Sequence, residues 1–306
     1  MKILVTGVGG QLGHDVMNEL ARRGHQGVGS DIAPVYSGIA DGSAMTEMPY
    51  VPMDITNDAQ VRQVMDDVRP DAVIHCAAWT DVDGAELPEN QAQVFAVNAD
   101  GTKNVAMACR DADCKLIYIT TDYVFDGTDT VPYPADCTRF APLNVYGQSK
   151  LAGEHAVAET LERYFIVRTS WVYGTGGKNF VRTMLQLSRT HDTLRVVSDQ
   201  IGTPTYAPDL ARLLADMAES DRYGRYNAVN SGGCVSWYAF ACAIFRAAGI
   251  PVTVLPVTTE EYGRSLAARP HSSRLDTGKL VESGFAPLPD WQDALARYLA
   301  AERAAD

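Results

Sequence analysis

The sequence begins with Lys2–Thr6 (KILVT), a short apolar stretch that runs directly into the glycine-rich segment Gly7–Gly13 (GVGGQLG). The apolar stretch is typical of a buried strand. Gln11–Arg23 then has helical spacing, with its apolar residues Leu12, Val16 and Leu20 on one face. The order of strand, glycine turn and helix at the start of the chain predicts the first unit of a nucleotide-binding α/β fold.

The glycine spacing predicts what this turn does. Gly7, Gly10 and Gly13 fit the pattern G-x-x-G-x-x-G, whereas Leu12 breaks the related G-x-G-x-x-G pattern. In both patterns glycine permits a tight turn and a close approach of the backbone to a pyrophosphate. The amino terminus of the following helix adds free N–H donors and the positive end of its dipole. We therefore predict that a dinucleotide binds at this turn.

Working outward, strand-like and helix-like segments continue to alternate. Strands are predicted at Gln26–Asp31, Tyr50–Met53, Ala72–His75, Lys115–Thr120 and Phe165–Arg168, and helices at Asp58–Val68, Val94–Cys109 and Tyr146–Leu161. Strands this apolar are expected when helices cover both faces of a parallel sheet. The fold class is therefore predicted as α/β, with a doubly wound parallel (Rossmann) sheet.

The pattern changes after about residue 170, where the predicted elements become shorter and less regular. We expect residues 1–170 to form the NAD(P)-binding Rossmann domain and residues 171–306 to form mainly a smaller C-terminal substrate-binding lobe. No linker-like segment separates the two parts, so we expect them to be interleaved and to share a core.

Composition excludes several classes of protein. The 306 residues include 26 Lys and Arg against 38 Asp and Glu, a formal net charge of −12. Such acidity argues against binding of nucleic acid or of an anionic membrane surface. No apolar run reaches the roughly 18 residues of a membrane helix, and no signal peptide is visible. The six cysteines form no CxxC pair. A cytoplasmic protein with reduced thiols is therefore expected.

Asp31 closes the second predicted strand, 18 residues after Gly13. This is near the usual place for an acid that bonds the adenosine ribose hydroxyls. A carboxylate there repels a 2′-phosphate, and no arginine follows within ten residues to offset it. Asp31 thus favours NADH over NADPH, with use of both left open.

Tyr146 and Lys150 form a Y-x-x-x-K pattern at the start of a predicted helix, so both side chains lie on one face. An ammonium beside the phenol is expected to lower the pKa of Tyr146 towards neutrality. Tyr146 can then protonate a carbonyl oxygen while hydride reaches its carbon. Thr121, or alternatively Thr120, ends the fifth strand, where a hydroxyl can bond the same oxygen.

Several stretches together resemble the extended short-chain dehydrogenase/reductases, and within them most closely the dTDP-4-dehydrorhamnose reductase branch. They are Thr6–Gly13 (TGVGGQLG), Ala77–Glu86 (AAWTDVDGAE), Val97–Asn98, Thr121–Gly127 (TDYVFDG), Pro142–Glu154 (PLNVYGQSKLAGE), Arg168–Gly174 (RTSWVYG), Asp199–Thr205 (DQIGTPT) and Arg269–Asp276 (RPHSSRLD). The resemblance implies NADPH- or NADH-dependent reduction of the 4-keto group of a dTDP-4-keto-6-deoxy sugar.

The same resemblance implies a role for each matching residue. The catalytic set is Thr121, Tyr146 and Lys150. The cofactor-binding set is Gly7, Gly10, Gln11, Leu12, Gly13, Asp31, Asp54, Ile55, Ala77, Ala78 and Thr80, together with Tyr146 and Lys150. The substrate-binding set is Thr80, Val82, Thr121 and Trp171. No metal ligand is assigned: some relatives bind Mg²⁺ at a dimer contact, and those ligands do not map onto this sequence. The expected partners are a dTDP-sugar and, as a possibility, a second copy of the chain.

Two departures and two alternatives stand beside this prediction. Trp79 is bulkier than the aromatic or His residue of many relatives, and residues 32–49 form a longer insertion beside the adenosine site. One alternative is another extended reductase or a nucleotide-sugar epimerase or dehydratase, although Thr121 is followed by Asp122-Tyr123 and not by the Asp-Glu of dehydratases. The other is a non-catalytic regulatory subunit that keeps the cofactor site.

Overall fold

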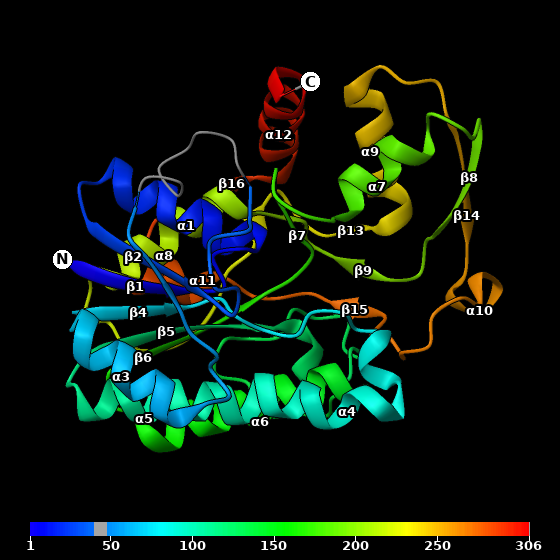
Figure 1. Ribbon diagram of the computed structural model, residues 1–306. Coiled ribbons are helices and arrows are strands. Elements are labelled where there is room, and N and C mark those ends of the chain that lie inside the picture. The colour runs from blue at the N-terminus through cyan, green and yellow to red at the C-terminus, as the bar shows by residue number, and fades with distance from the viewer. Residues whose placement is uncertain (40–47, 306) are drawn as a thin grey trace.

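The computed structural model describes residues 1–39 and 48–305. Its centre is a seven-stranded sheet in the order β11-β6-β5-β4-β1-β2-β3, and every pair within it is parallel (Figure 1). The strands are β1 Lys2–Thr6, β2 Gln26–Asp31, β3 Tyr50–Pro52, β4 Ala72–His75, β5 Lys115–Thr121, β6 Tyr164–Thr169 and β11 Gly224–Asn227. The chain fills one side of β1 first and then crosses to β4 on the other side, which confirms the predicted doubly wound fold.

Helices cover both faces of this sheet. On one face lie α1 (Gln11–Arg22) and α8 (Ala207–Ala218), and on the other lie α3 (Asp58–Val68), α5 (Thr102–Asp111) and α6 (Val145–Thr160) (Figure 1). Side chains of β1 alternate between two core clusters: Ile3 and Val5 pack with α1 and α8, whereas Leu4 packs with α3 and α5. Burial on both faces explains why the central strands β1 and β4 are mainly apolar.

The helix predicted at Val94–Cys109 is instead a composite of three segments. It consists of α4 (Pro88–Phe95), a π-helical stretch at Ala96–Gly101 and α5, preceded by a short 3₁₀ turn at Gly84–Glu86. Pro88 occupies the first turn of α4, where its missing N–H is not needed. The apolar pattern missed this early start and the wider turn, which places the buried Asn98 beside the site described below.

The C-terminal lobe lies at the upper right of Figure 1. It is built around a separate hydrophobic core that is rich in aromatic side chains. Its elements are β7 Val172–Tyr173, α7 Phe180–Leu187, β8 Thr193–Val197, β9 Ile201–Gly202, β10 Thr205–Tyr206, β12 Asn230–Ser231, β13 Val235–Ser236, α9 Trp237–Ala248, β14 Thr253–Val257, α10 Thr259–Tyr262, β15 Ser272–Ser273, β16 Leu288–Asp290 and α12 Trp291–Ala305. Small sheets of two or three short strands replace the long sheet in the described part of this lobe, in agreement with the shorter segments of the sequence.

After residue 170 the chain also returns to the sheet. Helix α8 packs against α1 on the same face of the sheet. Strand β11 extends the sheet beyond β6, and α11 (Gly278–Glu282) adds Leu280 to the same core. Residues from before and after position 170 therefore belong to one core cluster. The 32–49 insertion lies partly outside the described residues, at 40–47. No helix within residues 1–39 and 48–305 is long and apolar enough to cross a membrane.

Candidate active site

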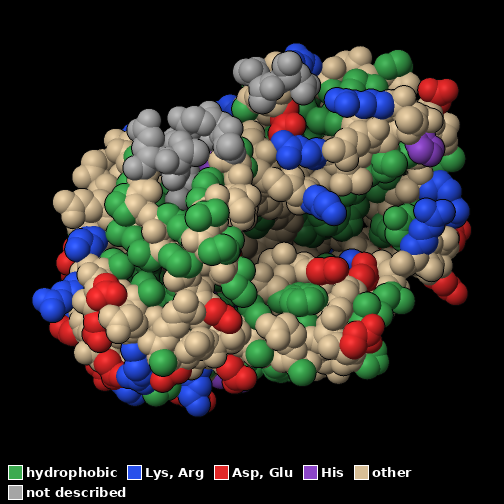
Figure 2. Space-filling model, viewed as in Figure 1, with side chains coloured by type: hydrophobic (Ala, Val, Ile, Leu, Met, Phe, Trp, Pro, Cys, Tyr) green, Lys and Arg blue, Asp and Glu red, His purple; other side chains and the backbone are tan. Residues whose placement is uncertain are grey.

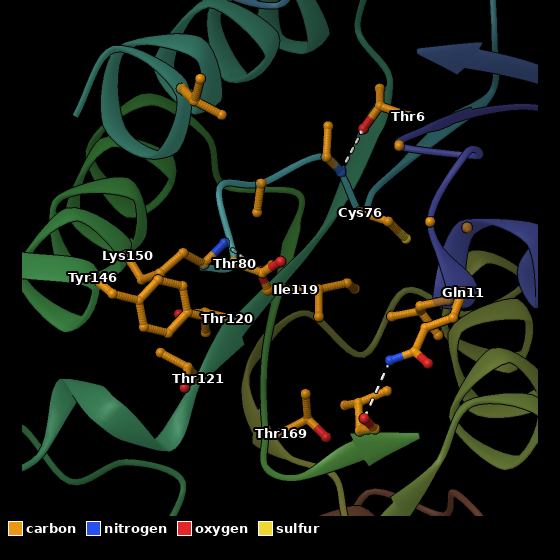
Figure 3. A pocket seen from close by; sticks show the side chains of 18 of the residues that line it. Thr6, Gln11, Cys76, Thr80, Ile119, Thr120, Thr121, Tyr146, Lys150 and Thr169 are labelled. Carbon is orange, nitrogen blue, oxygen red and sulfur yellow. Dashed lines mark hydrogen bonds between the residues drawn. The ribbon is translucent and has the colours of Figure 1, made fainter. Parts of the chain in front are cut away.

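A cleft of about 630 Å³ runs along the carboxyl ends of the parallel strands. Figure 2 shows the molecule hollowed between the sheet layer and the C-terminal lobe. The structure brings every predicted site residue into the lining of this one cleft: Gly7, Gly10, Gln11, Leu12, Gly13, Asp31, Asp54, Ile55, Ala77, Ala78, Thr80, Val82, Thr121, Tyr146, Lys150 and Trp171. In Figure 3 Tyr146, Lys150, Thr120 and Thr121 gather at one end, and Gln11 lies at the other.

The backbone of the glycine turn is packed so tightly that no side chain fits at Gly7 or Gly13. Gly7 has a φ of 72°, and a Cβ there would lie 2.5 Å from the backbone nitrogen of Ala77. A Cβ on Gly13 would lie 2.3 Å from the Gly7 carbonyl oxygen. The N-cap residue of α1 is Gly10, which has no side chain to cap the helix. The N–H groups of the first helical turn, which lines the cleft, therefore have no side-chain cap. This cradle fits the pyrophosphate of a dinucleotide.

The adenosine end is formed by the ends of β2 and β3. Asp31 accepts hydrogen bonds from the backbone N–H groups of Gly9 (2.9 Å) and Ile32 (2.8 Å). Asp54 accepts from Thr56, through the backbone at 2.9 Å and the hydroxyl at 2.7 Å. Both carboxylates are therefore held in place by local bonds, and both still line the cleft.

Lys150 is held at the opposite end of the cleft. Asn144 caps α6 by accepting a 2.7 Å hydrogen bond from the N–H of Gly147, which places Lys150 in the second turn. The Lys150 ammonium donates to the Ile119 carbonyl (2.8 Å) and lies 4.3 Å from the centre of the Tyr118 ring. Burial lowers the pKa of Lys150 to about 7, with the Glu154 carboxylate opposing the change.

Tyr146 differs from the expectation of a lowered pKa. Burial of the phenol raises its pKa above the ordinary value, and the nearby Asp122 carboxylate raises it further, while the Thr121 hydroxyl opposes the rise. The Lys150 ammonium, which donates to the Ile119 carbonyl, does not contribute to this shift in the pKa of Tyr146. Tyr146 is therefore protonated throughout the neutral range, the state that a general acid requires.

Thr121 is tied to an acidic neighbour that the sequence did not assign to the site. Its hydroxyl donates to Asp122 Oδ1 (3.0 Å) and accepts from the N–H of Tyr123 (3.2 Å). Asp122 is only 4% exposed, and burial raises its pKa to about 6. Thr120, the alternative to Thr121, also lines the cleft, but the bond to Asp122 and the influence on Tyr146 belong to Thr121.

Asn98 is a second side chain that the prediction gave no role. Its amide nitrogen donates to the Ser149 hydroxyl (2.9 Å) and to the Trp79 carbonyl (3.1 Å), and its oxygen accepts from the N–H of Trp79 (2.8 Å). A buried Asn in the middle of a helix was the available signal. Trp79 itself does not line the cleft, because its indole turns to the Asp81 carbonyl at 2.9 Å.

The substrate end carries an aromatic pair of which the sequence showed one member. Trp171 stacks on Trp237 with ring centres 3.5 Å apart, and both rings line the cleft. Trp171 has a φ of 50°, an uncommon backbone conformation for a bulky residue. A Cβ on Gly202 would lie 2.7 Å from the Trp171 ring, so glycine there makes room for it. Trp237 begins α9 directly after the capping Ser236, 66 residues after Trp171 in the sequence.

The doubly wound sheet, the glycine cradle and the Tyr146/Lys150 pair in one cleft define an oxidoreductase of the extended short-chain dehydrogenase/reductase class. The chain belongs to the family described as the RmlD substrate binding domain, whose model matches residues 1–304.

Individual relatives agree with this assignment. The chain is 40% identical over 299 residues to dTDP-4-dehydrorhamnose reductase of Streptomyces griseus, which covers 95% of this chain and 91% of that protein. It is 37% identical over 312 residues to dTDP-4-dehydrorhamnose reductase of Escherichia coli (strain K12), with 98% and 97% covered. The crystal structure of dTDP-4-dehydrorhamnose reductase from Bacillus anthracis in complex with NADP superposes with a TM-score of 0.85 at 40% identity and covers 98% of this chain and 99% of that one.

Proposed function

We infer that this protein is an NAD(P)H-dependent reductase that converts the 4-keto group of a dTDP-4-keto-6-deoxy sugar to an alcohol, taking dTDP-4-dehydrorhamnose to dTDP-L-rhamnose. The observation that carries this inference is the placement of Thr121, Tyr146 and Lys150 in the same cleft as the glycine cradle. The family membership and the named relatives support the same reaction.

The residues fit a nicotinamide cofactor along the whole cleft. The pyrophosphate has the cradle at Gly7–Gly13, where a Cβ on Gly7 or Gly13 would collide with backbone. The adenosine ribose has Asp31, and the adenine has Asp54 and Ile55. Ala77, Ala78 and Thr80 follow towards Lys150, which we assign to the nicotinamide ribose. When bound, the reduced nicotinamide supplies the hydride for the carbonyl carbon.

The protein's own residues handle the proton. Tyr146 holds a proton on its hydroxyl at neutral pH and transfers it to the carbonyl oxygen of the substrate. Thr121, oriented by its bond to Asp122 (3.0 Å), positions the same oxygen. Lys150, in its charged form, stabilises the phenolate that Tyr146 leaves behind.

We further propose a division of labour between the two parts of the chain. Residues 1–170 hold the cofactor, and residues 171–306 mainly bind the substrate, apart from α8 and β11, which complete the sheet layer. Thr80, Val82 and Trp171 contact the sugar nucleotide from the two sides of the cleft. This division predicts that changes in the lobe alter binding of the sugar nucleotide more than binding of the cofactor.

The choice of cofactor rests on Asp31, which we propose favours NADH while leaving NADPH usable. No arginine lines the cleft in the described part of the chain, so the 2′-phosphate of NADPH meets a carboxylate without a guanidinium beside it. Asp31→Asn should improve the NADPH-to-NADH affinity ratio by about 3- to 10-fold, measured by fluorescence titration of both cofactors. An unchanged ratio would contradict this preference.

A homodimer is part of the same proposal, since the family resemblance includes dimeric members. Its mass in solution would be twice the 33.2 kDa of one chain, and sedimentation analysis measures it directly. Adding Mg²⁺ and then a chelator during the same measurement tests whether this chain uses a cation at such a contact. Within residues 1–39 and 48–305, no cluster of three acidic, His or Cys side chains stands ready to hold one.

The deciding experiment is an assay with purified protein, dTDP-4-dehydrorhamnose and either NADH or NADPH. We expect the absorbance of the reduced cofactor to fall, with chromatography showing formation of dTDP-L-rhamnose. Omission of the sugar nucleotide provides the background rate. Binding of either cofactor without oxidation in the presence of substrate would overturn the proposed function and favour a regulatory role.

A further inference from the structure

The cleft has few positive charges for the ligands proposed above. Of its described lining residues, three are acidic (Asp31, Asp54 and Asp122) and two are basic (Lys150 and Lys178). A dinucleotide and a sugar nucleotide each bring a diphosphate. The amino terminus of α1 offers only about half a positive charge, together with N–H donors. At least one of the two diphosphates therefore needs a further cation.

Lys150 is not available for this purpose. Lys150 as a whole residue is 2% exposed, and its ammonium donates to the Ile119 carbonyl at 2.8 Å. It lies at the Tyr146 end of the cleft, away from Gln11 and the glycine turn (Figure 3). Lys150 therefore serves the reacting end and cannot also neutralise a phosphate at the other.

Arginines close to the cleft are already paired. Arg168 forms a fully buried ion pair with Glu154 (2.7 Å). Arg269 forms a bidentate pair with Asp83 at 3.0 and 2.8 Å. Neither guanidinium lines the cleft. Their charges hold the structure together and leave Lys178 as the remaining candidate among the described residues.

Lys178 is exposed and makes no hydrogen bond or ion pair with any part of the chain that the structure describes. The backbone around it is nevertheless anchored. Arg182 donates to the carbonyls of Thr175 (2.6 Å) and Gly177 (3.0 Å), and Asn179 donates to that of Gly174 (2.8 Å). The Lys178 side chain therefore contributes no bond to the described fold, and its ammonium is available to a ligand.

The loop lies between the two places where diphosphates are expected. At one end, a Cβ on Gly176 would be 3.3 Å from the Cα of Gln11, the first residue of α1. At the other end, Phe180 packs on Trp237 with ring centres 4.5 Å apart. Lys178 stands between these two contacts, so its flexible side chain can reach a phosphate bound near either.

We propose that Lys178 is the phosphate-binding cation of the cleft, which forms a charge-assisted contact with a phosphoryl group of a bound nucleotide. The inference rests on the proposed function, because it takes its ligands from there. Two ligands carry the same chemistry: the cofactor, at the α1 end, and the dTDP-sugar, at the Trp237 end. A separate binding measurement for each ligand tells them apart.

The test uses the full chain and the variants Lys178→Gln and Lys178→Arg, with Lys103→Gln as the control, since Lys103 is an exposed lysine on α5 away from the cleft. One arm titrates NADH and NADPH by fluorescence, and the other titrates dTDP by calorimetry. We expect Lys178→Gln to weaken binding in one arm by about 5- to 10-fold, a value reduced for solvent exposure. Lys178→Arg should stay within about twofold of wild type, and added salt should reduce the difference.

A loss confined to the cofactor arm assigns the contact to the dinucleotide, and a loss confined to the dTDP arm assigns it to the sugar nucleotide. Both affinities within about twofold of wild type for Lys178→Gln would overturn the proposal, as would an equal loss in Lys178→Arg. Neither arm requires turnover. A failure of the proposed reaction therefore appears in the oxidation assay, whereas a failure of this inference appears in the binding titrations.

Discussion

The two ends of the cleft differ in the groups that form them: backbone at one end and side chains at the other. At the cofactor end the backbone defines the site: Gly7 and Gly13 leave no space for a Cβ, and free N–H groups of α1 face the ligand. At the substrate end side chains define it, through the stacked rings of Trp171 and Trp237. A site made of backbone tolerates few residue types and so leaves a readable motif. A site made of side chains from distant segments leaves a weaker one.

Removing the phenol hydroxyl should have the largest effect and should affect chemistry without affecting either binding end. Tyr146→Phe is expected to lower kcat by about 10²- to 10⁴-fold, because the proton donor is lost. Fluorescence titration of NADH should give an affinity within about twofold of wild type. A near wild-type rate in Tyr146→Phe would remove Tyr146 from the mechanism.

The backbone-built end is tested by adding one methyl group. Gly7→Ala places a Cβ 2.5 Å from the Ala77 nitrogen at a φ of 72°. We expect it to weaken cofactor binding by at least about tenfold and to lower the free energy of unfolding by about 2–4 kcal/mol. Gly249→Ala is the matched control, since Gly249 has a φ of 71° but no atom within 4 Å of the new Cβ. Its expected cost is about 1 kcal/mol with unchanged cofactor affinity. Equal effects in the two variants would show that backbone conformation alone, and not close approach, shapes the turn.

Lys150 gives the reacting end a dependence on pH. Its pKa is about 7 in the folded chain and about 10.5 in the unfolded one, so the unfolded chain binds more protons between these values. The free energy of unfolding contributed by this group therefore rises with pH across that window and is smallest below pH 7. The wild type minus Lys150→Met difference in denaturant stability should increase by about 2 kcal/mol from about pH 7 to about pH 9. A difference that stays flat would place the ammonium in contact with water.

Substitution of Trp237, at the substrate end, should have the smallest effect of these variants. It should also separate substrate binding from cofactor binding most clearly. Trp237→Ala removes the partner of Trp171, and we expect the KM for the sugar nucleotide to rise by about fivefold, as for loss of one aromatic pair. The cofactor affinity should not change. Trp237→Phe, which keeps a ring, should recover most of the loss. Weaker cofactor binding in Trp237→Ala would show that the two ends of the cleft are not independent.

Sequence reasoning reached most of the fold because its signals are local. The KILVT strand, the glycine turn and the apolar stripe of α3 each predict their own structure. Reasoning failed where a long-range contact decides. Asn98 sits in a π-helical turn that apolar spacing alone does not predict, and its role depends on Ser149 and Trp79. The raised pKa of Tyr146 depends on burial and on Asp122, which the spacing of Tyr146 and Lys150 does not show.

The residues of the candidate site follow the same rule. Every residue that the family motifs predicted lines the cleft, because those motifs follow the ends of parallel strands. Trp237 and Lys178 lie in segments that carry no such motif, and only the fold brings them to the cleft. The roles assigned to all of these residues, the domain division, the homodimer and the cytoplasmic location stay predictions.

The late arrival of β11 and α8 in the sheet layer has a practical consequence for anyone who handles this protein. A fragment ending at residue 170 would leave β6 as an open edge strand. It would also uncover apolar side chains of β1 and α1 that pack in one core with α8, among them Ile3, Val5, Val16 and Leu20. Such a fragment should aggregate when it is produced alone. The full chain should melt in one transition. A nucleotide bound in the cleft should protect residues from both parts of the chain against proteolysis, because it stabilises the folded state as a whole.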